Sequence, residues 1–67
     1  MNDRKMIGQA IREARIKKNI TQKKLAFMTG SHESLICRVE KGSYSTTIDF
    51  ISNILDKLEL KIDINEI

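Results

Sequence analysis

The chain has 67 residues, enough for one small domain with a modest hydrophobic core. A single cysteine excludes an intramolecular disulfide and a multi-cysteine metal site, and no apolar run approaches the ~20 residues that span a bilayer. Residues 1–15 lack the continuous apolar segment of a signal peptide and favour an amphipathic helix. We therefore expect a cytoplasmic protein, in which oligomerisation adds stability to a small core.

The charges divide unevenly along the chain. Residues 1–41 hold ten Lys and Arg against four acids, whereas residues 42–67 hold two Lys against five acids. A basic front and an acidic back favour a domain that presents one face to a polyanion such as nucleic acid. A mixed, solvated surface is the alternative interpretation of the same charges.

A first helix is predicted over about 3–18, where Asp3 can act as its N-cap. Its apolar residues recur with the spacing of one buried stripe. They are Ile7, Ala10, Ile11 and Ala14. Asn19 tolerates the left-handed conformation that ends many helices, so we expect the helix to end there.

Two short helices with a tight turn between them are predicted next. The first covers about 22–28 with Thr21 as its N-cap, and the second covers about 32–40 with Ser31 as its N-cap. Gly30 stands where the turn needs a positive φ. This is the layout of a helix-turn-helix, in which the second helix enters the DNA major groove.

A fourth helix is predicted over about 46–58, with Thr46 and Asp49 as a capping-box-like pair. One apolar stripe comprises Ile48, Ile51, Leu55 and Leu58. Phe50 and Ile54 lie on a different face from that stripe. They indicate either a second interface or a wide apolar face that the first helix covers.

The tail from Leu60 to Glu66 alternates apolar and polar residues, which is typical of a half-buried strand. A lone strand in a helical chain has no partner, so we expect it to pair with the same strand of a second protomer about a two-fold axis. A disordered tail is the alternative. The predicted dimer interface comprises Phe50, Ile54, Leu60, Ile62 and Ile64.

The predicted fold is therefore all-α, a bundle of four to five helices with a short C-terminal β-strand paired across a dimer. Residues 1–58 form the DNA-binding domain in this interpretation, and residues 59–67 form the strand for dimerisation.

Several residues at set spacings resemble the Cro/C1-type (XRE-like) helix-turn-helix family of phage and bacterial repressors. They are Ile7-Gly8, Ile11-Arg12-Glu13, Arg15, Thr21-Gln22, Leu25-Ala26, Gly30, Ile36 and Val39-Glu40-Lys41-Gly42. The resemblance implies a lambda-repressor-like fold. The end of the chain, TTIDFISNILDKLELKIDI, is similar to HipB-type antitoxins, in which a fourth helix and a C-terminal strand form the dimer.

The resemblance places the third helix in the major groove, with His32, Glu33, Ser34 and Arg38 against base edges. The chemistry of these side chains agrees, since Arg can donate two hydrogen bonds to guanine O6 and N7. Glu33 can accept from a cytosine amino group and also repels phosphate. A solvated first turn, in which Glu33 suits the helix dipole, is the alternative for His32 and Glu33.

Candidate contacts to the DNA backbone come from the start of the second helix and from the loop after the third. The predicted phosphate-contacting residues are Gln22, Lys23, Lys41, Ser43, Tyr44 and Ser45. A helix N-terminus independently favours a phosphate at Gln22. The resemblance also implies an internal salt bridge between Arg15 and Glu40. Cys37 is interpreted as a small side chain tolerated near the DNA.

These features predict a sequence-specific DNA-binding repressor that acts as a homodimer on an inverted-repeat operator. The tail adds the hypothesis of an antitoxin that binds a toxin protein and autoregulates its operon. A stand-alone phage-type repressor, or a protein-interaction module that has lost DNA binding, are the alternatives. We expect no enzyme activity, cofactor, metal, membrane or small-molecule substrate, because the chain lacks a nucleophile–base pair, a phosphate-binding glycine loop and a metal constellation.

Overall fold

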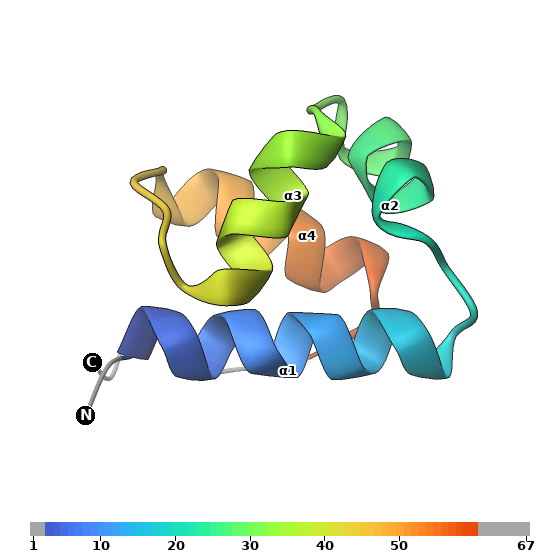
Figure 1. Ribbon diagram of the computed structural model, residues 1–67. Coiled ribbons are helices and arrows are strands. Elements are labelled where there is room, and N and C mark those ends of the chain that lie inside the picture. The colour runs from blue at the N-terminus through green and yellow to red at the C-terminus, as the bar shows by residue number, and fades with distance from the viewer. Residues whose placement is uncertain (1–2, 61–67) are drawn as a thin grey trace.

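The computed structural model describes residues 3–60, which form an all-helical bundle (Figure 1). Its helices are α1 (Asp3–Lys17), α2 (Gln22–Thr29), α3 (Glu33–Lys41) and α4 (Ile48–Lys57). Figure 1 shows α1 along one side of the molecule, with α3 packed across it and α2 beside α3. The all-α prediction is confirmed for this part of the chain. Residues 61–67, which hold most of the predicted strand, lie outside the described residues.

Threonine side chains cap the start of two helices. The Thr21 hydroxyl accepts a hydrogen bond from the Lys24 backbone N–H at 3.0 Å, as the sequence predicts for α2. In α4 the cap is Thr47, whose hydroxyl accepts from the Phe50 N–H at 3.1 Å. The prediction that Thr46 opens this helix is wrong by one residue, because either threonine has the chemistry of a cap and only the path of the preceding loop selects between them.

The start of α3 differs from the prediction. Its N-cap is His32, which makes no side-chain capping bond. Ser31, the predicted cap, instead has its hydroxyl 2.9 Å from that of Thr29, at the end of α2. The serine is therefore part of the turn between the helices and does not cap α3.

All four helices end in the same way, with a left-handed residue directly after the last turn. These residues are Asn19, Gly30, Gly42 and Glu59, with φ between 55° and 77°. The next residue donates its N–H back across the turn, as Ile20 does to the Arg15 carbonyl at 3.0 Å. This Schellman geometry satisfies carbonyls that the helix end leaves open. The predicted roles of Asn19 and Gly30 as helix ends are confirmed.

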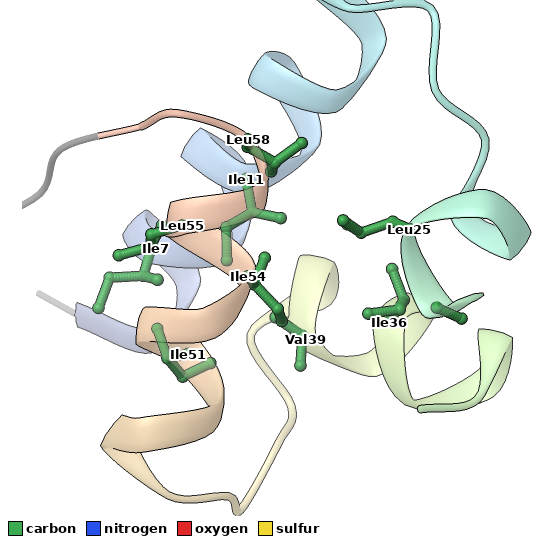
Figure 2. Close-up of a cluster of buried hydrophobic side chains, with 10 residues drawn as sticks. Ile7, Ile11, Leu25, Ile36, Val39, Ile51, Ile54, Leu55 and Leu58 are labelled. Atoms are coloured by element: carbon green, nitrogen blue, oxygen red, sulfur yellow. The ribbon is translucent and has the colours of Figure 1, made fainter. Parts of the chain in front are cut away.

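Apolar side chains from all four helices meet in one core (Figure 2). Its members are Ile7, Ile11, Leu25, Ala26, Ile36, Val39, Ile51, Ile54, Leu55 and Leu58. No helix in the described residues is long and apolar enough to cross a membrane.

The predicted faces of α4 need correction. Ile54 is fully buried inside the protomer, so its assignment to a dimer interface is wrong. Figure 2 shows it between Ile11 and Val39, because α1 and α3 meet α4 from different sides and bury a wide face of it. Phe50 is half-buried against the same core. Ile48, placed in the buried stripe by the sequence pattern, is instead 59% exposed.

Candidate nucleic-acid interface

The third helix, α3, has an inner side that is buried and an outer side that is exposed. Ile36 and Val39 are completely buried on the inner side. The outer side carries Ser34, Arg38 and Lys41, whose spacing places them in one exposed row along the helix. His32 and Glu33, just before and at the first turn, are exposed as well. The structure therefore places all four predicted base-contacting residues on accessible surface at or near one helix.

The Arg38 guanidinium is available for a ligand. No described residue forms an ion pair with it, and the two salt bridges among the described residues join other side chains. Its planar array of donors fits a guanine edge or a phosphate.

A buried ionic network fixes the inner side of α3. Arg15 Nε lies 2.6 Å from Glu40 Oε2, and Arg15 Nη2 donates to Glu40 Oε1 at 3.1 Å. The Gln22 amide Nε2 donates to the same Oε1 at 3.0 Å. Arg15 Nη1 also donates to the Ile20 carbonyl at 2.8 Å. One carboxylate thus connects α1, the start of α2 and the end of α3.

Burial makes this network important for the position of α3. The side chains of Arg15 and Glu40 are 12% and 2% exposed, so neither charge is well solvated. Buried charges need partners, and no buried side-chain polar atom among the described residues lacks one. The structure brings the predicted pair together. The bond from Gln22 could not be predicted, because nothing local in the sequence indicates that its amide meets an acid 18 residues later.

Gly8 allows α1 to cross close to the end of α3. A Cβ atom at this position would lie 2.2 Å from the Val39 carbonyl oxygen and 2.8 Å from that of Glu40. In the sequence, Gly8 has no predicted role beyond its place in the family resemblance. A glycine inside a helix, next to the apolar stripe, was the available signal of a close contact. It costs the helix ~1 kcal/mol relative to alanine, so it usually marks a site where packing leaves no room for a side chain.

The predicted phosphate-contacting residues form two groups on opposite sides of α3. Gln22 and Lys23 lie at the start of α2, and the loop after α3 follows Lys41 on the other side (Figure 1). Lys23, Lys41, Ser43 and Ser45 are exposed. The Gln22 side chain is half-buried, with its amide nitrogen on Glu40. Its backbone N–H is in the first turn of α2, where the helix itself offers no acceptor.

Tyr44 is the least accessible of the predicted phosphate contacts. Its ring packs partly against the core, and the Arg4 guanidinium carbon lies 5.9 Å from the ring centroid. Burial raises the pKa of the Tyr44 hydroxyl above its ordinary value, and the positive charge of Arg4 opposes this change. The phenol is therefore neutral at pH 7 and does not repel a phosphate.

Comparisons with known proteins agree with this geometry. A helix-turn-helix family model matches residues 11–65. Control protein C.BamHI of Bacillus amyloliquefaciens is 37% identical over 54 residues, which are 79% of this chain and 67% of that protein. The crystal structure of the restriction-modification controller protein C.AhdI from Aeromonas hydrophila superposes with a TM-score of 0.79 and 30% identity, covering 88% of this chain and 86% of that one. The chain belongs to the helix-turn-helix family of DNA-binding regulators.

Proposed function

We propose that this protein is a sequence-specific transcriptional regulator that binds an inverted-repeat operator as a homodimer, with α3 in the major groove. The observation that carries the proposal is the exposed row of Ser34, Arg38 and Lys41, on a helix whose opposite side is held by Glu40. A rigid helix with a free arginine on its outer side is suited to reading base edges.

The proposed base contacts come from the N-terminal half of α3 and from Arg38. Arg38 donates two hydrogen bonds to a guanine, and Ser34 bonds to whichever base edge it meets. Glu33 accepts from a cytosine amino group and disfavours other bases. His32 precedes the helix and donates to a base or to the adjacent phosphate.

The proposed phosphate contacts flank the groove on both sides of α3. Gln22 and Lys23 at the start of α2 hold one strand, and Lys41, Ser43 and Ser45 hold the other. Such contacts fix the register of the protein on DNA and carry no sequence information. Tyr44 belongs to this second group through its neutral hydroxyl, although its ring is partly buried.

A homodimer follows from the size of the reading surface. One α3 presents only a few residues to the bases, and a second copy related by a two-fold axis doubles the contacts. The half-sites then lie ~10 base pairs apart, centre to centre. Of the predicted dimer residues, Phe50 and Leu60 are half-buried against the core, and Ile62 and Ile64 lie outside the described residues.

The relatives favour control of restriction-modification genes as the biological role. C.BamHI is named a control protein and C.AhdI a restriction-modification controller protein. We therefore propose that this chain regulates genes of that kind. The antitoxin hypothesis receives no support, since neither relative is named as one.

A binding selection from a randomised DNA duplex library tests the function. The wild-type protein should enrich an inverted repeat, and Arg38→Ala should lose preference at one base pair per half-site. A lost bidentate contact corresponds to ~1–3 kcal/mol of discrimination. Arg12→Ala is the matched control, because Arg12 is an exposed arginine on α1, outside the proposed interface.

Each result of the selection has a definite meaning. No enrichment by the wild-type protein contradicts the proposed function. An unchanged motif with Arg38→Ala contradicts the role of Arg38 alone. A motif that changes equally with Arg12→Ala shows that loss of positive charge explains the effect and not a contact with a base.

A further inference from the structure

The first turn of α1 lies against the end of α3. A Cβ atom at Gly42, which ends α3 with φ 77°, would lie 2.6 Å from Lys5 Cα and 2.9 Å from the Lys5 backbone nitrogen. One turn further along α1, a Cβ at Gly8 would meet the Val39 carbonyl oxygen. Two backbone contacts therefore fix this turn relative to α3. Figure 1 shows it on the same side of the molecule as the loop that follows α3.

Side chains join the same turn to that loop. The Arg4 guanidinium carbon lies 5.9 Å from the centroid of the Tyr44 ring, within the range of a cation–π interaction. Stacking uses the face of a guanidinium, whereas its N–H donors point outward in its plane. Tyr44 packs partly against the core, so its ring holds Arg4 next to a loop whose Ser43 and Ser45 are proposed phosphate contacts.

The charges of this turn are divided between two sides of the helix. Arg4 and Lys5 are exposed, whereas Asp3 is half-buried and lines a groove toward the start of α4. Two residues separate Asp3 from Lys5, which places their side chains about 160° apart around the helix. Arg4 lies between them and also lines the groove. Lys5 therefore adds its positive charge on the side of Gly42, where Lys41 is exposed as well.

We propose that Arg4 and Lys5 bind phosphates of the DNA backbone, next to those that the loop after α3 contacts. This inference rests on the proposed function and extends its interface to a third element, α1. The ammonium of Lys5 suits a phosphate as a point charge, and the guanidinium of Arg4 suits it as a planar array of donors. Because the turn is fixed against Gly42, both cations reach the backbone when α3 enters the major groove.

Phosphate contacts have an expected signature that differs from that of base contacts. They position a protein on DNA and carry no sequence information directly. They also release counterions, which makes affinity fall as salt concentration rises. The first turn of α1 should therefore contribute affinity and salt dependence, and should leave the recognised bases unchanged.

The salt dependence of operator binding tests the proposal, with the inverted repeat enriched by the wild-type protein as the probe. Each phosphate contact contributes about 0.9 to the slope of log affinity against log salt concentration, so a contact made by both protomers contributes roughly 1.8. Lys5→Ala and Arg4→Ala should each reduce the slope by that amount. Lys5→Arg and Arg4→Lys keep the charge and should retain most of the wild-type slope.

Lys57→Ala is the matched control for loss of one positive charge. Lys57 is an exposed lysine in the last turn of α4. That helix ends near Lys18, at the other end of α1 from Lys5, since Glu59 forms an ion pair with Lys18 at 2.7 Å. The control should keep the wild-type slope.

Neutral phosphates identify the contact itself. Operator duplexes that carry one symmetric pair of methylphosphonates, placed at each position in turn, measure the loss of affinity for every phosphate. The position that Lys5 contacts should weaken binding by the wild-type protein and have no effect on binding by Lys5→Ala. The remaining sensitive positions should weaken both proteins equally. The same comparison with Arg4→Ala locates the phosphate that Arg4 contacts.

The outcomes separate this inference from the proposed function. A reduced slope, together with a phosphate that loses its effect in the variant, supports the proposal. A wild-type slope in both alanine variants overturns it, as does an equal reduction with Lys57→Ala or a reduced slope in which every phosphate keeps its effect. A changed base preference in the variants overturns it as well. A wild-type protein that enriches no operator contradicts the proposed function and this inference together, whereas operator binding that the alanine variants leave unchanged contradicts this inference alone.

Discussion

The inner and outer sides of α3 are constrained very differently by the rest of the molecule. On the inner side, Glu40 has three hydrogen-bonded contacts from Arg15 and Gln22, and the helix backbone leaves no room for a Cβ on Gly8. On the outer side, Ser34 and Arg38 are exposed and have no role in packing. The helix is thus held by its inner side, so substitutions on the outer side should leave the fold unchanged.

The largest effect should come from removing Glu40. Glu40→Ala leaves the Arg15 guanidinium, which is only 12% exposed, without its carboxylate. Removing one partner of a buried pair typically costs ~3–5 kcal/mol in the free energy of unfolding. Urea unfolding followed by circular dichroism measures this loss.

Lys18→Ala is the control for Glu40→Ala. It breaks the exposed pair of Lys18 with Glu59, and should scarcely move the unfolding midpoint. Similar midpoints for the two variants would show that burial of the Arg15 pair adds nothing to its strength.

Gly8→Ala should be the next most damaging change. The new Cβ would meet the Val39 carbonyl oxygen, which is backbone and cannot rotate away. Overpacking of this kind costs typically ~1–3 kcal/mol, and α1 must shift relative to α3. Thermal unfolding gives the stability change, and operator affinity shows whether the shift reaches the outer side. A stable variant with unchanged affinity would disprove the close crossing.

Gly30→Ala separates steric contact from backbone strain. No atom lies within 4 Å of a Cβ at this position, but the residue has φ 66°. The expected loss of stability is therefore only the left-handed penalty of ~1–2 kcal/mol. Gly30→Asn should lose less, since asparagine tolerates this conformation. If the alanine and asparagine variants unfold at the same temperature, the loss of stability does not come from the left-handed backbone.

The smallest effect on stability is expected from the outer side. Glu33→Ala, Ser34→Ala and Arg38→Ala should each change the free energy of unfolding by less than ~0.5 kcal/mol, because exposed residues without packing contacts contribute little. The same variants should change base preference in the selection. A variant that unfolds at a clearly lower temperature than the wild-type protein would mean that the outer side also stabilises the fold.

Most residues of the proposed interface could be predicted from the sequence. The contacts that hold α3 in position could not. Thr21, Gly30 and the exposed spacing of Ser34 and Arg38 are local features, and turn and capping chemistry act over a few residues. The position of Gln22 at a helix start predicts a phosphate contact. Its amide nitrogen is in fact on Glu40, a contact made only when α2 and α3 pack.

The sequence by itself determined the helices, their left-handed ends at Asn19 and Gly30, and the helix-turn-helix layout, since each depends on residues close together in the chain. Only the tertiary structure decided that Ile54 belongs to the core, that Thr47 caps α4, and that Gly8 lies against the end of α3. A helical pattern shows which residues share a face. What covers that face depends on segments that fold onto it from elsewhere in the chain.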